Sequence, residues 1–246
     1  MLQTLKSNVK KLLPSPVLAT WKRIRYAREQ ALARGRPLDE VFSEIYEKNV
    51  WATPDAGVRY SSGPGSAPEV TRGYEDFVVG YIERHPEIER LVDVGCGDFQ
   101  VANRILGRLS RPIAYVGCDI APNVVAYNQE HRARPGVSFV HLDVTRDQLP
   151  PGDLVTVREV FQHLSNDAIL AALANLRRSF KHAIVTESQP LSTERPNLDI
   201  VSGYRTRDGL HSGVYLNLPP FGLTILDEYI VTASSNEVLR SMLVLL

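Results

Sequence analysis

Short hydrophobic runs alternate with amphipathic segments through the middle of the chain. The hydrophobic runs are nearly continuous, which is typical of strands buried on both faces of a parallel sheet. They cover residues 91–95, 114–120, 137–144, 153–159 and 182–188. Apolar residues recur at helical spacing over 99–109, 123–133 and 166–180. This alternation predicts an α/β domain whose sheet is covered by helices on both faces.

The flanking segments extend this plan at both ends. Two helices are predicted before the first strand, over 38–51 and 71–85. The segments 224–231 and 237–246 have the pattern of two last strands, one of them antiparallel to the rest. We therefore expect a Rossmann-like sheet of seven mostly parallel strands, with a helical extension at the N-terminus.

The first 36 residues are strongly basic. They contain nine Lys or Arg residues and one acidic residue, in the pattern of one or two amphipathic helices interrupted by Pro14 and Pro16. Such a segment is either a solvated helical face or a contact with a membrane surface, an acidic partner or a second subunit. A homodimer and a peripheral membrane contact are therefore both open.

Composition narrows the class of protein. The 246 residues carry no net formal charge, 43% are hydrophobic and 23% are charged, which is ordinary for a globular protein and argues against a nucleic-acid binder. The chain has no run of about 18 apolar residues that would predict a membrane-spanning helix, and we expect no signal peptide. Cys96 and Cys118 lack the spacing of a zinc site or a disulfide framework. We expect a cytoplasmic protein.

The first predicted strand runs into a glycine turn, Gly95-Cys96-Gly97-Asp98. A dinucleotide-binding turn has a third glycine and leaves the helix N-terminus free for a pyrophosphate. Here the third glycine is missing, and Asp98 places a negative charge where a phosphate would lie. The turn is therefore predicted to hold a cationic ligand without phosphate. S-adenosylmethionine, which carries a sulfonium and an ammonium, fits this description.

The stretch VDVGCGDF resembles the first motif of class I S-adenosylmethionine-dependent methyltransferases. The resemblance implies that Asp119 accepts from both ribose hydroxyls and that Asp143 accepts from the adenine amino group. The alternative is that one of the acids only caps a helix, and Asp98 is the foremost candidate for that. Tyr46 and Trp51 either roof the site or pack in the core. The residues predicted to bind the cofactor are Tyr46, Trp51, Ser62, Gly63, Asp93, Gly95, Cys96, Gly97, Asp98, Phe99, Asp119, Ile120, Asp143, Val144 and Arg158.

Five segments extend the resemblance over about residues 38–222. They read VFSEIYEKNVW, SSGPGS, VGCGDF, REVFQHLS and NLDIVSGYRTRDGL. Together they are similar to a bacterial subfamily of this fold, whose implied activity is O-methylation of glycans or small molecules. We accordingly divide the chain into a basic helical extension with a cofactor-covering loop, 1–70, and a methyltransferase domain, 71–246. Residues 190–222 are predicted to form a lid over the acceptor site.

Methylation of a hydroxyl requires that the acceptor lose its proton, so a base is expected at the end of the fourth strand. If residues 158–164 are helical, Glu159 and His163 lie four apart on one face, and Glu159 orients the imidazole. His163 is then the general base, and the alternative is a buried structural histidine. Magnesium is a second way to acidify a hydroxyl. Its candidate ligands are Glu159, Glu187 and Asp208.

The predicted lid is rich in side chains that can hydrogen-bond to a polyol or stack on it. The candidates for acceptor binding, with one from the fifth strand, are Glu187, Tyr204, Arg205, Arg207, Asp208, His211 and Tyr215. The alternative is a solvated loop with a few packed aromatic side chains.

Three functions remain open. The first is O-methylation of a hydroxyl of a saccharide or glycan precursor, and one specific candidate is the enzyme type that caps methylmannose oligosaccharides at the reducing-end hydroxyl. The second is methylation of a natural product or another small metabolite. The third is a regulatory protein that binds S-adenosylmethionine without turnover.

Overall fold

The computed structural model describes residues 31, 34–51, 59–233 and 236–246. The predicted basic helices of residues 1–36 lie almost entirely outside these residues, so their contacts with a membrane or a second subunit stay predictions. Within the described ranges, no helix is both long and apolar enough to cross a membrane.

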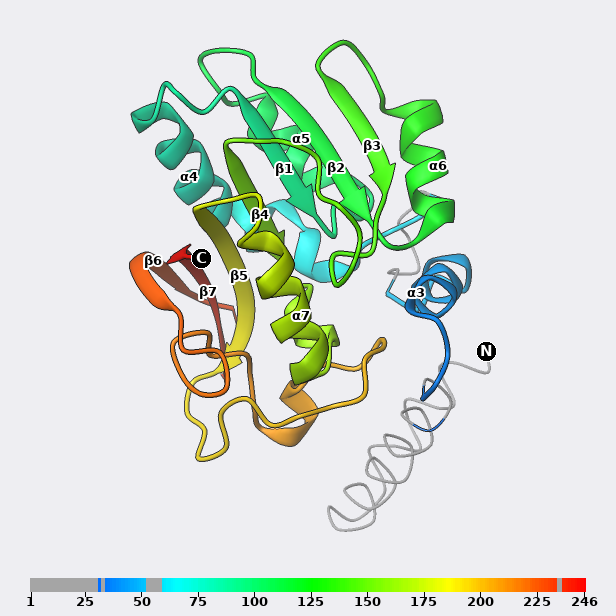
Figure 1. Ribbon diagram of the computed structural model, residues 1–246, viewed down its shortest axis with the longest axis vertical. Helices are drawn as coiled ribbons and strands as arrows, with labels where there is room; N and C mark the ends of the chain where they lie inside the picture. Colours follow the sequence, from blue (N-terminus) through cyan, green and yellow to red (C-terminus); the bar gives the residue numbers. More distant parts are fainter. Residues whose placement is uncertain (1–30, 32–33, 52–58, 234–235) are drawn as a thin grey trace.

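The described part of the chain is built on one seven-stranded sheet (Figure 1). Its spatial order is β3-β2-β1-β4-β5-β7-β6. The strands are β1 (Arg90–Val94), β2 (Ala114–Asp119), β3 (Val137–His141), β4 (Leu154–Arg158), β5 (His182–Pro190), β6 (Thr224–Thr232) and β7 (Glu237–Leu245). The first five are parallel, and β7 is antiparallel to both of its neighbours, β5 and β6. The predicted sheet of seven strands with one antiparallel strand is confirmed.

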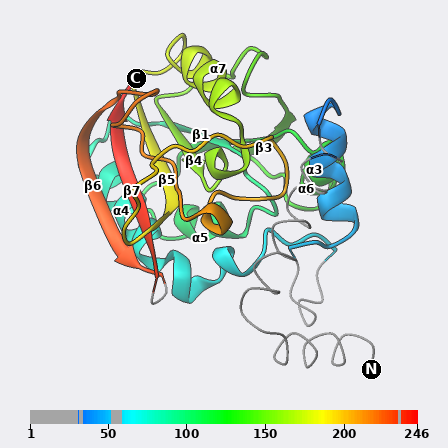
Figure 2. The same ribbon diagram turned by 90° about the horizontal axis from the view of Figure 1, so that it is seen from below.

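Helices cover both faces of this sheet, as Figure 2 shows from below. One face carries α7 (Asn166–Leu176), and the other carries α4 (Pro68–Arg84) and α5 (Gln100–Leu106). Beside β3 lies α6 (Pro122–His131), with α3 (Leu38–Glu47) packed next to it. The short 3-10 turns are η1 (Pro64–Ser66), η2 (Phe161–His163) and η3 (Asp208–Leu210).

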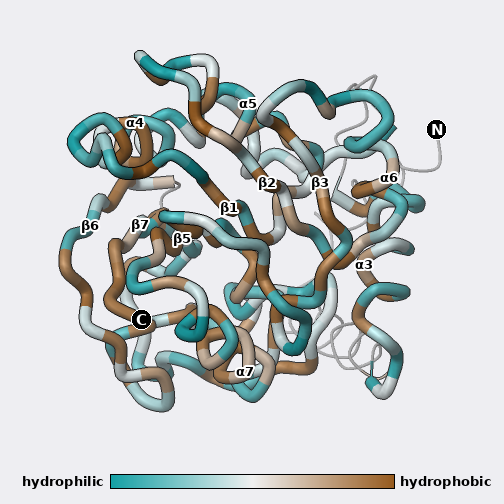
Figure 3. The backbone as a smooth tube through the Cα atoms, turned by 45° about the horizontal axis from the view of Figure 1, so that its top comes forward, coloured by the Kyte–Doolittle hydropathy of each residue, from teal (hydrophilic) through white to brown (hydrophobic). Residues whose placement is uncertain are grey.

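The alternation of side chains along each strand explains why both faces are covered. In β1, Leu91 packs with the side chains of α4 and α5, whereas Val92 and Val94 pack with those of α7. All three are at most 3% exposed. Figure 3 shows the same division, with hydrophobic strands in the interior and hydrophilic stretches on the surrounding loops and helices. Burial on both faces accounts for the continuous hydrophobic runs in the sequence.

Two predicted boundaries differ from the structure for local reasons. The helix expected from residue 99 begins at Gln100, because Phe99 has a left-handed backbone with φ of 65°. The strand expected to reach residue 144 ends at His141, and the next amide, that of Leu142, donates to the Asp119 carbonyl at 3.0 Å. Asp143 therefore lies in the loop beyond β3, next to the carboxyl end of β2.

Candidate active site

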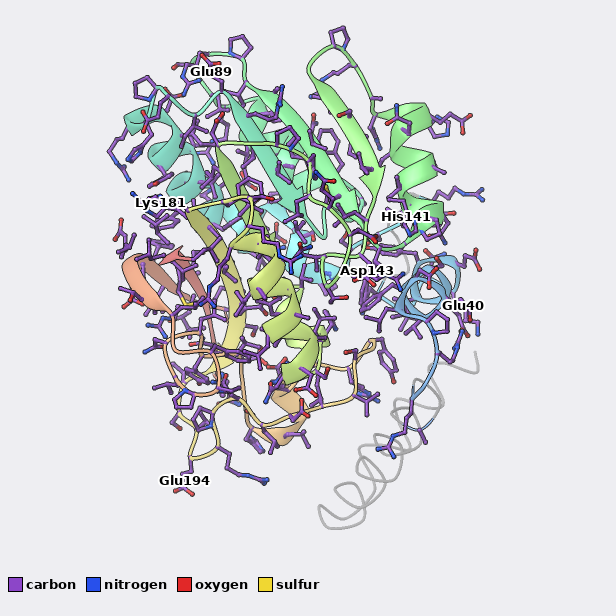
Figure 4. The ribbon with its side chains drawn as sticks, in the orientation of Figure 1. Glu40, Glu89, His141, Asp143, Lys181 and Glu194 are labelled. Atoms are coloured by element: carbon purple, nitrogen blue, oxygen red, sulfur yellow. The ribbon has the colours of Figure 1, made fainter. Side chains whose placement is uncertain are left out.

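A cavity of about 450 Å³ opens at the carboxyl ends of the parallel strands. Its walls come from the tips of β1, β2 and β4, the loop after β3, α3, and the loop over η1. Figure 4 labels Asp143 on this wall, where the end of β3 faces α3. Ligands of open α/β sheets bind at this edge, so the position of the cavity agrees with the predicted site.

The glycine turn after β1 needs both of its glycines. Gly95 and Gly97 have φ values of 74° and 52°, which side chains rarely adopt. A Cβ on Gly95 would overlap Val160, and a Cβ on Gly97 would overlap the Ser62 hydroxyl. Gly95 lines the cavity together with Cys96 and Asp98, whereas Gly97 and Phe99 do not.

The side chain of Phe99, a predicted cofactor contact, lies in the core. Its ring is 2% exposed and packs against the rings of Tyr115 and Phe139 at centroid distances of 5.1 and 5.0 Å. Phe99 therefore stabilises the left-handed turn from within the core. The Phe99 side chain does not line the cavity, and its predicted part in cofactor binding stays a prediction.

Asp98 links the glycine turn to the loop before η1. Its Oδ2 accepts from the Ser62 amide at 2.9 Å, and its own amide donates to the Ser62 hydroxyl at 3.0 Å. Its Oδ1 accepts from the amide of Gln100, the first residue of α5, at 3.2 Å. This last bond satisfies the free amide of the first residue of α5, whose N-cap residue is Phe99.

The three other predicted acids all line the cavity, each held in place differently. Asp93 accepts from Tyr115 and Thr156 at 2.8 and 2.7 Å, and burial raises its pKa to about 6. Asp119 accepts from the Gly97 and Ala121 amides, both at 2.9 Å, and burial raises its pKa as well. These bonds fix Asp119 against the glycine turn and Asp93 between β2 and β4.

Asp143 is held within its own loop. Its Oδ1 accepts from the amide and the hydroxyl of Thr145, at 2.9 and 2.6 Å, and its Oδ2 lies 3.2 Å from the Arg146 guanidinium. Ile120 and Val144, the neighbours of Asp119 and Asp143, line the same part of the cavity. The structure therefore brings the acids at the ends of the first three strands to one wall.

Another part of the cavity wall is aromatic. Tyr46 and Trp51 line the cavity and meet edge to face at a centroid distance of 5.3 Å. The Tyr46 and Ser62 hydroxyls are 3.5 Å apart, and Gly63 lies against the backbone of Trp51. Both aromatic residues thus stand beside the glycine turn while packing against neighbouring rings.

The end of β4 carries a strained acidic residue. Glu159 has a φ of 54°, and its amide donates to the Thr186 carbonyl at 2.7 Å. Its carboxylate lies 3.1 Å from the Arg158 guanidinium, which also donates to the Gly65 carbonyl. The Arg158 Nε is buried and has no hydrogen-bond partner among the described residues.

The predicted pairing of Glu159 with His163 is wrong. The left-handed backbone at Glu159 breaks the expected helix, and only the short 3-10 turn η2 follows. Glu159 instead pairs with Arg158, and within the described part of the chain no hydrogen bond joins it to the imidazole. Both residues nevertheless line the cavity.

His163 is 9% exposed and packs against aromatic rings. Its ring centroid lies 5.2 Å from that of Trp51 and 6.3 Å from that of Phe42. Burial lowers its pKa to about 4, against an opposite effect of the backbone of residues 203–205. The imidazole is therefore neutral at pH 7, and its Nδ1 has no partner among the described residues.

Two predicted acceptor ligands are buried structural residues instead. Glu187 is fully buried, and its carboxylate accepts from the amides of Phe161 and Gln162, both at 2.9 Å. Arg207 is 1% exposed and donates to main-chain carbonyls, including that of Leu164 at 2.7 Å. Neither lines the cavity, because their polar atoms are engaged in holding η2.

The rest of the predicted lid divides in two. Tyr204 and Arg205 line the cavity, whereas Asp208, His211 and Tyr215 do not. Asp208 accepts from Thr206 at 2.8 Å, with a pKa raised by burial to about 6. His211 is exposed, and Tyr215 donates to the Pro190 carbonyl at 3.3 Å. The proposed roles of these three residues in acceptor binding stay predictions, and their side chains lie outside the cavity lining.

The predicted magnesium ligands do not form a shared site. Both carboxylate oxygens of Glu187 accept hydrogen bonds from backbone amides. Glu159 lines the cavity, whereas Asp208 does not. Among the described residues, no group of three or more His, Cys, Asp or Glu side chains is arranged to hold a metal.

The sequence missed several residues that line the cavity. Gln162 precedes His163 on η2, and its place beside the candidate base was the available signal. Phe42 follows the helical period of α3 and resembles an ordinary core residue. Thr206 lies within the predicted lid, but no motif or spacing in the sequence distinguished it as a lining residue.

Part of the chain is similar to a known protein family. Residues 92–182 match the family model described as a methyltransferase domain. This segment is similar to methyltransferase domains. The match spans β1 to the first residue of β5 and so includes the glycine turn, the three acids of the cavity wall and η2. No curated protein matches the chain by sequence.

Solved structures share the fold of the methyltransferase domain at low sequence identity. Human N-acetylserotonin methyltransferase in complex with SAM is 17% identical with a TM-score of 0.51, and the match covers 85% of this chain and 60% of that enzyme. Magnesium protoporphyrin IX methyltransferase from Synechocystis PCC 6803 with bound SAH is 12% identical with a TM-score of 0.53, over 82% of this chain and 98% of that one.

A third neighbour, the [4+2]-cyclase SpnF, is 17% identical with a TM-score of 0.53, over 84% of this chain and 93% of that one. Likenesses at this level show the fold alone: a Rossmann-like S-adenosylmethionine-dependent methyltransferase fold. Because a cyclase shares it, the acceptor and the reaction must be argued from the site.

Proposed function

We propose that the chain is an O-methyltransferase that uses S-adenosylmethionine to methylate a hydroxyl of a saccharide or glycan precursor. One observation carries the proposal: a single cavity joins the acids at the tips of β1 to β3 with the neutral imidazole of His163. A donor site and a proton acceptor are the two parts that methylation of a hydroxyl requires.

The residues of the first wall fit the donor. The Arg158 Nε is a buried donor atom without a partner among the described residues, which suits the carboxylate of the donor's amino-acid part. Asp119 lines the cavity and accepts from the Gly97 and Ala121 amides, which hold its carboxylate in place to accept from the ribose hydroxyls. When bound, S-adenosylmethionine supplies a methyl group already activated by a sulfonium.

The chain itself orients the acceptor, excludes water and receives a proton. Phe42, Tyr46 and Trp51 close the cavity with apolar rings, which keeps water from the reacting hydroxyl. His163 lines the cavity and its Nδ1 has no partner among the described residues, so the imidazole is placed to receive the hydroxyl proton. The Arg158–Glu159 pair lines the same cavity, and Arg158 holds the loop over η1 through the Gly65 carbonyl.

A saccharide suits the acceptor side because the wall combines aromatic rings with polar groups. Trp51 and Tyr204 line it with rings on which the apolar face of a sugar can stack. Arg205 and Thr206 line it with hydrogen-bonding side chains.

The proposal is tested by incubating the purified protein with S-adenosylmethionine and panels of oligosaccharides and small hydroxylated metabolites, with mass spectrometry of the products. Methylated saccharide supports it, and products only among the metabolites would move the function to small-molecule methylation. Donor binding without any product would indicate a protein that binds S-adenosylmethionine without turnover.

His163→Asn should keep donor affinity and lose most of the turnover. The matched control is His211→Asn, because His211 is exposed outside the cavity and asparagine tolerates its left-handed backbone. Loss of donor affinity and turnover together in His163→Asn would contradict the role of His163 as the base.

A further inference from the structure

Two buried ionisable side chains hold the three-residue turn η2 from below. Glu187 accepts from the amides of Phe161 and Gln162, both at 2.9 Å. Arg207 donates to the carbonyls of Phe161, Gln162 and Leu164 at 2.9, 3.3 and 2.7 Å. Burying such groups is costly unless they are fully hydrogen-bonded. The fold therefore holds the backbone of this short turn with more hydrogen bonds from buried charged side chains than a connecting turn requires.

The turn presents two polar side chains to the cavity, those of Gln162 and His163. They are 7% and 9% exposed. The Gln162 Nε2 donates to the Glu159 carbonyl at 3.4 Å, which identifies Oε1 as its free acceptor. Among the described residues, neither this Oε1 nor the His163 Nδ1 has a hydrogen-bond partner. A buried polar atom without a partner costs about 1–3 kcal/mol, so two on one rigid turn indicate a place for a ligand.

Aromatic side chains flank these polar groups. The ring of Trp51 lies 5.2 Å from that of His163, and the ring of Phe42 lies 6.3 Å from it. Leu38 and Val50 extend the apolar surface of the cavity wall. A ligand that suits this wall has an apolar ring face for the aromatic side and hydroxyl groups at its edge for the polar side.

We propose that Gln162 determines acceptor specificity by accepting a hydrogen bond from a second hydroxyl, one that neighbours the hydroxyl facing His163. The acceptor is thus a diol on a ring. This inference rests on the proposed function and adds the class of acceptor to it. Glu187 and Arg207 act as positioning residues that hold Gln162 and His163 toward the cavity. Sugars and catechols both carry such a diol, and the test separates them.

The experiment compares acceptors that differ by one hydroxyl. The probes are methyl α-mannopyranoside with its 2-deoxy and 3-deoxy analogues, and catechol with phenol. For the wild-type protein, kcat/KM for the diol should exceed that for its monohydroxy or deoxy counterpart by about tenfold to a hundredfold, because the counterpart leaves the Gln162 oxygen unpaired. Preference within the mannoside set identifies a sugar, and preference within the phenol set identifies a catechol.

Gln162→Leu should reduce this preference to less than about threefold while donor affinity stays unchanged. The matched control is Gln148→Leu, since Gln148 is exposed outside the cavity, and it should retain the wild-type preference. A full preference in Gln162→Leu, or equal rates with diol and deoxy probes in the wild type, would overturn the assignment.

Calorimetry of the same probes on protein saturated with S-adenosylhomocysteine gives a readout that does not need turnover. Binding of a diol that weakens in Gln162→Leu supports the inference. If the protein binds S-adenosylhomocysteine but neither binds nor methylates any diol probe, the inference is overturned and the donor site stands. Failure to bind S-adenosylhomocysteine at all would instead overturn the proposed function.

Discussion

Ser62 and Asp98 hold each other by two hydrogen bonds across 36 residues of sequence. The Ser62 amide donates to the Asp98 carboxylate at 2.9 Å, and the Asp98 amide donates to the Ser62 hydroxyl at 3.0 Å. The pair fastens the loop over η1 to the glycine turn after β1. The two hydrogen bonds therefore join the glycine turn, on the proposed donor side of the cavity, to the loop that covers the cavity.

Replacement of Ser62 by alanine tests that junction. The variant loses the acceptor of the Asp98 amide, and we expect S-adenosylhomocysteine to bind roughly threefold to tenfold more weakly, because one hydrogen bond contributes about 1 kcal/mol. Calorimetry measures the change. The matched control is Ser61→Ala, which removes only a hydrogen bond within the loop, from the Gly63 amide. Equal affinity of the Ser62 variant and the wild type would show that the junction does not shape the donor site.

Gly97→Ala should damage the turn. The new Cβ would overlap the Ser62 hydroxyl, and φ is 52°, so we expect loss of donor binding together with a stability loss of about 1–3 kcal/mol. Urea unfolding and calorimetry measure the two effects. Gly209→Ala is the control, since a Cβ there meets no atom within 4 Å. A Gly97 variant that is as stable as this control and binds the donor as tightly would contradict the described geometry of the glycine turn.

The depressed pKa of His163 makes stability depend on pH in a defined window. The unfolded chain protonates this residue below about pH 6.5, and the folded chain only below about pH 4. The unfolded state therefore binds more protons between these values, and the free energy of unfolding should rise with pH across the window by about 3 kcal/mol from this residue.

His163→Asn should lose that part of the pH dependence, as measured by urea unfolding at intervals from pH 4 to 7. His211→Asn, at an exposed position, should keep it. A slope in the His163 variant as steep as in the wild type would mean that the imidazole titrates normally in the folded protein.

Glu187→Gln tests the support beneath η2. The amide offers one carbonyl oxygen where two backbone amides now donate, so one donor is left unpaired in a fully buried place. We expect a loss of about 1–3 kcal/mol in the free energy of unfolding. The control is Glu194→Gln, at the tip of an exposed loop (Figure 4), which should be neutral. A neutral Glu187 variant would show that the carboxylate does not hold the turn.

The fold was predictable because its signals are local. Continuous hydrophobic runs identified the parallel strands, and the spacing of Gly95 and Gly97 identified the turn that needs left-handed backbone. The acids after the first three strands were predictable for the same reason, since parallel strands end at one edge of a sheet. Asp119 and Asp143 accordingly line one cavity.

The acceptor side could not be predicted in the same way. Glu187 and Arg207 are polar residues at sites where the sequence suggests a ligand, and only the packing of distant segments shows that they are buried against η2. The conformation of Glu159 is likewise imposed by the bond from its amide to Thr186 on β5. Glu159 and His163 have a helical spacing in the sequence, but the segment between them does not form an α-helix.

The central claim is that the cavity at the tips of β1 to β3 binds an adenosyl donor through Asp119 and its neighbours. Titration calorimetry with S-adenosylhomocysteine tests it most directly, with Asp119→Asn and the control Asp153→Asn, whose carboxylate binds the amides of Glu89 and Arg90 outside the cavity. We predict one ligand per chain, weakened about tenfold or more by Asp119→Asn and unchanged by the control. No heat with S-adenosylhomocysteine, alongside clear binding of a nicotinamide dinucleotide, would contradict the account.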